Sequence, residues 1–440
     1  MSITDIRSLS IVEIPIDTIV PFATNPMEHP TGQISMLKRS MTRFGFTNPV
    51  LLTPDNVVIA GHGRLIAAKE LGCTHVPAII LSGLTEAEQR AYRIADNAIA
   101  LKGKWALDLL AIEAQYVLDA GIAPIELGFE MGELDFAIEG AKKEKAKAEE
   151  PVPEPARTGP PVSRVGDLWT VGLHRILCGD ARDPACYRIL MGGEKADMVL
   201  TDMPWNVPVN GHVSGLGKIK HPEFPMASGE MGKEEFASFT TIVFQNQADF
   251  AKPGALVLEF IDWRSVAMMI TVGETIFDRL MNICVWVKPS GGMGSLWRSR
   301  HELVCAFRVK GGKHANNVRL GKFGRNRTNV WEYAAPNGFG SERENLKIHP
   351  TAKNVEMLAD AILDCTQRGG IVLDPFLGSG ATILGAQGVG RIGRGMELDP
   401  YYVDLAVQRI TKEIGNEAVL ADGRTFAEVT SERHGGEAAA

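Results

Sequence analysis

The sequence of 440 residues has few cysteines and no long apolar run, and both shortages exclude classes of protein. Its six cysteines include no C-x-x-C pair, so they support neither a disulfide framework nor a zinc site, and we interpret them as buried free thiols. No apolar stretch approaches the length that crosses a bilayer. The first fifteen residues lack the basic flank and apolar block of a secretory signal, so we expect a cytoplasmic protein. The cysteines are Cys73, Cys178, Cys186, Cys284, Cys305 and Cys365.

Positive charge is also scarce overall, and the net charge of −7 taken alone argues against nucleic acid. The charge is unevenly distributed, however. Between residues 298 and 327, nine basic residues are opposed only by Glu302. Such density on a segment that contains Gly and Asn favours a surface for phosphates over an ordinary solvated face. The nine residues are Arg298, Arg300, Arg308, Lys310, Lys313, Arg319, Lys322, Arg325 and Arg327.

Apolar residues are sparse between 141 and 163, where a mixed-charge run precedes five prolines. This composition is typical of an extended linker. We therefore predict an N-terminal domain over 1–140 with a helical extension, a linker over 141–163 and a second domain over 164–420. Residues 421–440, which end in GGEAAA, are predicted to form a loose tail.

Both domains have mixed α/β patterns. In the first, VLLT (50–53) and VVIA (57–60) flank a turn and predict a hairpin, and Thr85 and Glu88 have the spacing of a capping box. In the second, short apolar strands alternate with helices, which predicts a mostly parallel, Rossmann-like sheet covered by helices. The predicted strands are 168–172, 174–179, 196–202, 254–260, 283–288, 303–309, 369–374 and 392–398.

The segment LDPFLGSGATILGA (373–386) predicts a strand that ends at Asp374, a glycine-rich turn and a helix. Gly378 and Gly380 permit a tight turn and close approach of a ligand to the backbone. Glu397 ends the next strand, seventeen positions after Gly380, where a carboxylate can accept both hydroxyls of a ribose. Because the dinucleotide fingerprint is absent, a ribose-bearing ligand without a pyrophosphate fits better. A purely structural turn is the alternative.

The segment VLTDMPWNV (199–207) predicts a buried strand that delivers Asp202 at its carboxyl end. An aromatic amine is a poor nucleophile because its lone pair is delocalised into the ring. Asp202 and the carbonyl beside Pro204 could accept its two hydrogens and localise that lone pair. Trp205 offers a stacking face for an extruded base. A buried Trp beside an ordinary strand-end Asp remains the alternative.

Together the two motifs resemble the amino-group DNA methyltransferases, with F-x-G-x-G for the cofactor and D-P-P-[Y/W/F] for the target. Further segments extend the likeness over about residues 164–415: HRILCGDAR (174–182), the W-x-K and HE segments within 285–311, HPTAKN (349–354) and GMELDPYYVDLAVQRI (395–410). The resemblance implies S-adenosylmethionine as cofactor and no metal. The residues implied near the cofactor are Asp180, Asp374, Phe376, Gly378, Gly380, Glu397, His349, Thr351 and Lys353.

The target motif precedes the cofactor motif, which resembles the permuted beta group of these enzymes, in which the intervening region recognises DNA. Two departures stand out. Met203 replaces a proline of the target motif, which is expected to loosen its turn, and Asn354 replaces the last proline of H-P-T-x-K-P. The residues implied to contact double-stranded DNA are Lys288, Arg298, Arg300, Lys313, Arg319, Lys322, Arg325 and Arg327.

The first domain resembles the ParB-like nuclease and sulfiredoxin-type domain, which often precedes methyltransferases in phage-derived genes. The likeness rests on residues 14–30, 44–52, 57–72 and 84–97. Gly61, His62, Gly63 and Arg64 lie at a strand-to-helix turn, a plausible anion site that Asn25 and His29 are expected to face. Because Pro26 replaces a usual arginine, we favour a DNA-docking or assembly module over nucleotide binding or phosphodiester cleavage.

We therefore predict a site-specific DNA methyltransferase that modifies the exocyclic amino group of adenine. Cytosine N4 is the first alternative, and a nucleotide-regulated DNA-binding protein with a vestigial methyltransferase domain is the second. RNA methylation is disfavoured by the ParB-like module. A homodimer is compatible with the sequence, and no restriction partner is identifiable, so we expect a methyltransferase that acts without a partner nuclease.

Overall fold

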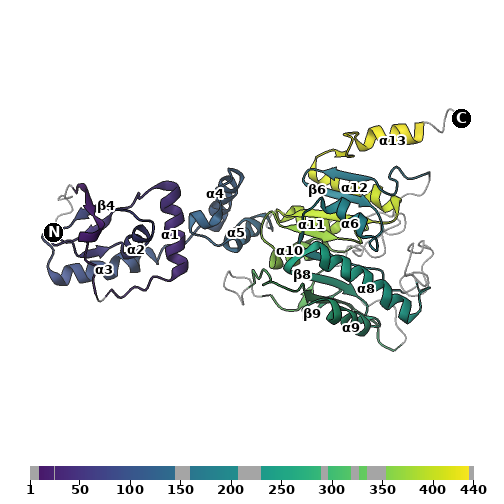
Figure 1. The fold of residues 1–440 in the computed structure, drawn as a ribbon, viewed down its shortest axis with the longest axis horizontal. Coiled ribbons are helices and arrows are strands. Elements are labelled where there is room, and N and C mark those ends of the chain that lie inside the picture. The colour runs from purple at the N-terminus through teal and green to yellow at the C-terminus, as the bar shows by residue number, and fades with distance from the viewer. Residues whose placement is uncertain are drawn as a thin grey trace, which may run out of the picture. The chain divides into compact units, whose positions relative to one another are not determined.

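The computed structural model describes residues 9–23, 25–143, 159–206, 229–288, 296–318, 327–333 and 353–435. The chain divides into two compact units, Met1–Ala146 and Lys147–Ala440 (Figure 1). The division falls inside the segment interpreted as a linker, of which residues 144–158 lie outside the described ranges. Among the helices of the described ranges, none is long and apolar enough to cross a membrane.

The N-terminal unit is built on a four-stranded sheet in the order β1-β4-β2-β3. Strands β2 and β3 form the predicted antiparallel hairpin, and Val50, Leu52 and Val58 are buried in the core beneath it. The capping box predicted at Thr85 and Glu88 is present and begins α3. The elements are β1 (Ile11–Pro15), η1 (Ile16–Thr18), α1 (Thr31–Phe44), β2 (Val50–Leu52), β3 (Val58–Ala60), α2 (His62–Glu70), β4 (His75–Ile80), α3 (Glu86–Ala100), α4 (Leu107–Asp119), η2 (Pro124–Leu127) and α5 (Met131–Lys143).

The second unit is built on a ten-stranded sheet in the order β11-β9-β10-β8-β7-β12-β13-β6-β5-β14. Strands β8, β7, β12, β13 and β6 are parallel neighbours at its centre. All eight predicted strands are present, although their bounds shift by a few residues. The strands are β5 (Leu168–Val171), β6 (His174–Cys178), β7 (Ala196–Thr201), β8 (Ala251–Ile261), β9 (Arg279–Val287), β10 (His301–Arg308), β11 (Val330–Glu332), β12 (Ile371–Asp374), β13 (Ile392–Glu397) and β14 (Ala418–Val419).

Helices cover both faces of this sheet, as the alternation of side chains along β6 shows. Leu177 packs into a cluster with α6, α8 and α9, whereas its neighbours Ile176 and Cys178 pack into a cluster with α11 and α12. The fold is therefore the predicted α/β, Rossmann-like sheet (Figure 1). The helices are α6 (Pro184–Met191), α8 (Lys233–Phe250), α9 (Val266–Ile276), α10 (Val355–Cys365), α11 (Ala381–Gly388), α12 (Pro400–Ile414) and α13 (Phe426–Gly435).

The prediction of a loose tail from residue 421 is wrong over most of its length. Helix α13 packs on the sheet through Val429, which is fully buried. Arg433 donates hydrogen bonds to the Asp167 carboxylate and to the Val162 carbonyl. Composition did not reveal these contacts, because the partners of Arg433 lie more than 200 residues earlier in the chain.

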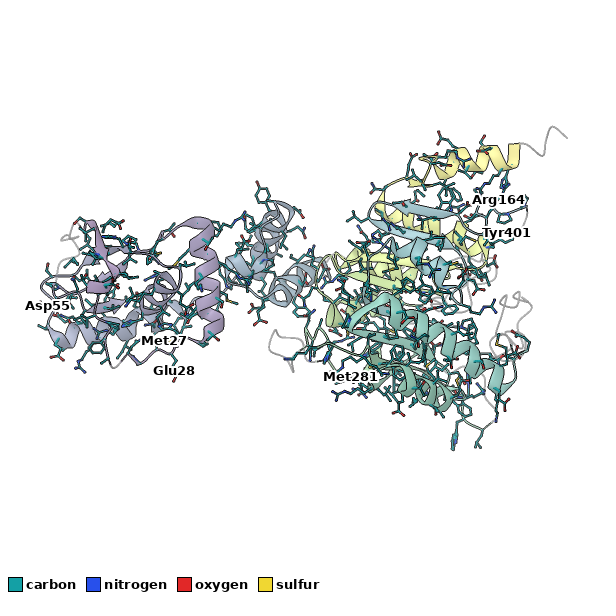
Figure 2. The ribbon with its side chains drawn as sticks, in the orientation of Figure 1. Met27, Glu28, Asp55, Arg164, Met281 and Tyr401 are labelled. Carbon is teal, nitrogen blue, oxygen red and sulfur yellow. The ribbon has the colours of Figure 1, made fainter. Side chains whose placement is uncertain are left out.

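The segment before β5 is held against α12 by polar contacts. The Asp404 carboxylate accepts hydrogen bonds from the backbone N–H groups of Val162 and Ser163, at 2.7 and 2.8 Å. The Tyr401 hydroxyl donates to the Gly159 carbonyl at 2.8 Å. Figure 2 labels Tyr401 and Arg164 in this part of the second unit. Gly159, which lies inside the segment interpreted as linker, therefore contacts the fold of the second unit.

We predict that Phe244→Ala lowers the free energy of unfolding of the full chain by about 3–5 kcal/mol. Phe244 is fully buried, and its ring contacts those of Phe277 and Phe307 at centroid distances of 5.2 and 5.8 Å. Ile242→Ala, on the same helix but with 46% of the residue exposed, is the matched control and should change it by less than about 1 kcal/mol. Urea unfolding measures both, and equal losses would contradict this account of the core.

Candidate active site

The residues singled out in four separate segments meet at one edge of the second unit's sheet. Strand β6 leads to Asp180, β7 leads to Asp202, β12 ends at Asp374 and β13 ends at Glu397. Because these strands are parallel, their carboxyl ends lie at the same edge. From β7 the chain continues to β8 on one side, whereas from β12 it continues to β13 on the other. Ligands of open α/β sheets bind at such a switch point.

The glycine-rich turn is tied directly to Glu397. Gly378 N–H donates to Glu397 Oε2 at 2.9 Å, and Asp399 N–H donates to Oε1 at 2.9 Å. Gly378 and Gly380 have φ of +52° and +88°, and Gly380 caps α11. Burial raises the pKa of Glu397 to about 7, although these backbone hydrogen bonds oppose the shift. Each carboxylate oxygen keeps a lone pair for a ligand hydroxyl.

Asp374 connects the glycine-rich turn to the end of β7 through hydrogen bonds. It is 4% exposed, and its Oδ1 accepts hydrogen bonds from Thr201 Oγ1 at 2.5 Å and from Phe376 N–H at 3.0 Å. Burial raises the pKa of Asp374 to about 6, against hydrogen bonds from Thr201 and Thr382. The Thr201 bond joins the end of β7 to the end of β12, so the two predicted motifs are physically connected.

Two further residues predicted near the cofactor flank this turn. Asp180 receives a paired contact from the Arg182 guanidinium, with Nη2 at 2.6 Å from Oδ2. Burial would raise the pKa of Asp180, but the hydrogen bonds and charge of Arg182 outweigh it and lower the pKa. The Phe376 ring packs against Phe239 of α8 at 6.2 Å. Asp180 and Phe376 therefore have clear local roles, and a contact with a cofactor stays a prediction.

Two side chains of the target motif, those of Met203 and Trp205, pack against the apolar core. Met203 is 1% exposed, and its side chain packs in the core cluster of α6, α8 and α9. That Met203 loosens the turn stays a prediction. Trp205 Nε1 donates to the Phe260 carbonyl at 3.2 Å, which fixes the indole. The second departure is well accommodated, because Asn354 Oδ1 caps α10 by accepting from Met357 N–H at 2.8 Å.

Asp202 is joined to a buried network that sequence reasoning missed. Lys353 Nζ lies 2.6 Å from Asp202 Oδ2 and 3.0 Å from Glu302 Oε2, and Glu302 Oε1 is bonded by Lys288. Lys353 was assigned to the cofactor by resemblance, and the structure brings it to the catalytic candidate instead. Asp202 Oδ1 is buried and has no hydrogen-bond partner within the described ranges.

Three aromatic rings surround the Lys353 ammonium. Its Nζ lies 5.2 Å from the ring centroid of Trp205, 5.0 Å from that of Phe260 and 5.9 Å from that of Trp286. Ring faces attract a desolvated cation. Burial lowers the pKa of Lys353, but the charges and hydrogen bonds of Asp202 and Glu302 outweigh it and raise the pKa. The ammonium is therefore a fixed charge at the base of the site.

One more carboxyl group was missed. Glu259 of β8 is fully buried, and its Oε1 accepts from Gln247 Nε2 at 2.5 Å. Burial raises the pKa of Glu259 well above its ordinary value, and the charges of Asp374 and Asp202 add to the shift. This favours a neutral acid beneath the site. A single Glu in the apolar run GALVLEF was the signal available in the sequence.

The predicted DNA-contact residues have different surroundings. The described ranges contain three of them, Arg298, Arg300 and Lys313, and do not contain Arg319, Lys322 and Arg325. The residues predicted near the cofactor that also lie outside the described ranges are His349 and Thr351. Lys288 is paired with Glu302. Arg327 faces inward: its Nε lies 3.0 Å from Asp364 Oδ2 and its Nη1 3.3 Å from Asp360 Oδ2. The prediction that Arg327 contacts phosphate is therefore wrong, because Asp364 and Asp360 already neutralise its charge inside the fold.

The predicted anion site of the N-terminal unit gathers four basic side chains. Gly61, with φ +99°, caps α2, and the His29 ring packs against Gly63. His62 Nε2 and Arg64 Nε are buried without a hydrogen-bond partner in the described part of the chain. Burial, then the charges of Arg93 and His29, lowers the pKa of His62 to about 4. Arg93, the fourth member, was missed, and Asn25 instead bonds with the backbone of Met27.

Two family models match the chain. That of the N6/N4 DNA methylases matches residues 196–408, and that of the ParB N-terminal domain matches residues 2–98. The chain therefore contains a ParB N-terminal domain and an N6/N4 DNA methylase domain. The ParB match contains the whole four-stranded sheet, and the methylase match contains strands β7 to β13 of the ten-stranded sheet.

Individual relatives divide in the same way. The ParB-like nuclease domain-containing protein YnaK of Escherichia coli (strain K12) is 44% identical over 84 residues, which are 19% of this chain and 97% of that protein. The type II methyltransferase M.HpaI of Haemophilus parainfluenzae is 24% identical over 235 residues, 49% of this chain and 68% of that protein. M.ScaI of Streptomyces caespitosus is 34% identical over 108 residues, 23% of this chain and 35% of that methyltransferase.

The chain is similar to the solved structure of the M1.HpyAVI–SAM complex, which is 20% identical and covers 53% of this chain and 98% of its own, with a TM-score of 0.39. The cytosine-N4-specific PvuII DNA methyltransferase is 16% identical and covers 56% of this chain and 93% of its own, with a TM-score of 0.40. The chain spans about a third to two thirds of the curated methyltransferases that it matches.

We predict that Thr201→Val lowers the free energy of unfolding by about 1–3 kcal/mol at pH 8 and by less at pH 5. Thr201 donates to Asp374, whose pKa of about 6 makes it charged at pH 8 and protonated at pH 5, so the lost bond matters more above pH 6. Urea unfolding at both pH values measures the difference. Thr170→Val, on the half-exposed strand β5, is the control, and a loss independent of pH would contradict the assignment.

Proposed function

We propose that this chain transfers a methyl group from S-adenosylmethionine to the exocyclic amino nitrogen of adenine in double-stranded DNA. The observation that carries the proposal is the buried acceptor Asp202 Oδ1, which stands beside Trp205 at the same sheet edge as the glycine turn and Glu397. A ribose-binding half and an amine-binding half therefore share one switch point. The family match supports the reaction class and leaves adenine as the finer proposal.

The residues present fit the cofactor. Glu397 has lone pairs left for two ribose hydroxyls, and the turn at Gly378 and Gly380 carries no side chain that would obstruct a ligand. Phe376 adds an apolar wall beside α8. When bound, S-adenosylmethionine supplies an electrophilic methyl group on a sulfonium, which is already a good leaving group. The chain's own task is to bind it and orient it.

The target side requires an acceptor for an N–H group and a surface for the base. In the proposed reaction, Asp202 Oδ1 and the carbonyl beside Pro204 accept the two amino hydrogens and direct the nitrogen lone pair toward the methyl group. Trp205 provides the stacking surface, and its own N–H is already satisfied by Phe260. Holding both reactants in line supplies most of the rate enhancement. The proton leaves the nitrogen during or after attack.

The base must be extruded from the duplex to reach this site. Arg298, Arg300 and Lys313 are the described basic residues that we propose for phosphate contact, and the ParB-like unit is proposed to dock DNA through His62 and Arg64. Within the described part of that unit, His62 Nε2 and Arg64 Nε have no hydrogen-bond partner. We infer no dedicated nuclease partner, so the purified protein is expected to leave unmethylated DNA intact.

We predict that Asp202→Asn reduces methyl transfer at least about 1,000-fold, because the amide removes the charge that localises the amine's lone pair. S-Adenosylhomocysteine and DNA should still bind within about threefold. Labelled S-adenosylmethionine and unmethylated DNA provide the assay, and mass analysis of the nucleosides distinguishes 6-methyladenine from 4-methylcytosine.

Asp249→Asn, which is outside the site and paired with Gln245, is the matched control and should retain full activity. Full activity of Asp202→Asn would contradict the enzymatic proposal. The appearance of 4-methylcytosine would keep the mechanism and replace the target base.

We predict that affinity for S-adenosylhomocysteine rises between pH 6 and pH 8. The pKa of Glu397 is about 7, and only its ionised form is a strong acceptor for two ribose hydroxyls. Glu397→Gln should weaken binding about tenfold or more at pH 8 and remove most of the pH dependence. Calorimetry measures both. Glu413→Gln, exposed on α12, is the control, and a wild-type affinity unaffected by pH would refute this role.

A further inference from the structure

Charged side chains from four segments of the chain form a line of alternating charge in the candidate active site. Lys288 at the end of β9 bonds Glu302 of β10, Glu302 contacts Lys353 ahead of α10, and Lys353 contacts Asp202 after β7. Lys353 is 7% exposed and Glu302 8% exposed. A buried charge is costly unless it is paired. Each inner member of the line has an opposite charge on both sides.

The line distinguishes the two oxygens of Asp202. Its Oδ2 is taken by Lys353 Nζ at 2.6 Å, whereas its Oδ1 is buried without a partner in the described ranges. Lys353 is prevented from moving away by Glu302 Oε2 at 3.0 Å and by the rings of Trp205, Phe260 and Trp286. Because one oxygen is anchored, the direction in which the other points is set by the anchor.

We propose that Lys353, held by Glu302, is the positioning residue that fixes Asp202 through Oδ2 and leaves Oδ1 as the acceptor for the target's amino group. The identity of that target rests on the proposed function. The contacts themselves are properties of the chain. Lys353 touches neither the reacting nitrogen nor the methyl group in this assignment.

The charge of Lys353 also favours the ionised form of Asp202, although the pKa of Asp202 stays above its ordinary value. Burial raises the pKa of Asp202, and Lys353 is the largest of the opposing influences, whereas the like charge of Glu302 adds to the rise. A protonated Asp202 would have lost the charge that polarises the amine. The charged and titratable groups that face Asp202 from the surrounding elements are Lys353, Glu302, Lys288, Glu259 and Asp374.

The two neighbours of Asp202 therefore act in opposite directions, which makes the proposal testable. Lys353→Met leaves Asp202 facing Glu302 without a cation between them, so its titration midpoint should rise by about one pH unit or more. Glu302→Gln removes the like charge and keeps an oxygen for Lys353, so the midpoint should fall. A Lys353 side chain that did not contact Asp202 would shift neither midpoint in this paired way, and only a role in positioning Asp202 would move the rate profile with them.

The experiment is a carbon-13 NMR titration of the full chain labelled at the aspartate carboxyl carbon, in which the Asp202 signal is identified by its absence from Asp202→Asn. Lys353→Arg keeps the cation and should restore a midpoint near that of the wild type. Lys252→Met is the matched control: Lys252 pairs with Asp197 at the other end of β7, so this variant should leave the Asp202 midpoint unchanged.

A midpoint of Asp202 that is the same in wild type, Lys353→Met and Glu302→Gln overturns the proposal. Should Lys353→Met fail to fold, Glu302→Gln and Lys353→Arg decide the question by themselves. The acid limb of the rate profile for methyl transfer is then expected to move with the NMR midpoints. If the wild type transfers no methyl group, the proposed function fails, while the titration still decides whether Lys353 controls Asp202.

Discussion

A buried ammonium needs negative charge against it, and much of the candidate site is arranged around that need. Lys353 is surrounded by aromatic rings, where an unpaired charge would be costly. Asp202 and Glu302 supply the anions, and Lys288 balances the second of them. The order of strands β9, β10, β8 and β7 places these groups side by side. Satisfying one cation thus orients the residue proposed to hold the target amine.

The cofactor half of the site depends on a second set of bonds at the same sheet edge. Glu397 holds Gly378, and Asp374 holds the turn through Phe376. Thr201 connects this half to the target half across the β7–β12 boundary. Buried carboxyl groups with raised pKa values are concentrated here, as expected where a site has to bind and polarise ligands. The two halves therefore share structural support as well as position.

Several predictions from residue pattern agree with the structure because they depend on local properties. The hairpin at 50–60, the capping box at Thr85 and the eight strands of the second unit follow from periodicity and turn residues. Other predictions were wrong because composition does not reveal partners. Arg327 is neutralised by Asp360 and Asp364, and α13 is anchored by Val429.

The sequence by itself determined where the glycine turn, the target motif and the strand ends lie, because each depends on residues that are close together in the chain. It also implied that the strand ends would meet, since parallel strands share an edge. Only the tertiary structure decided that Lys353 contacts Asp202, 151 residues away, and that Glu302 is its second acidic partner. The physical reason is that such contacts depend on the order of strands in the sheet and on the orientation of buried side chains, and neither is specified by local pattern.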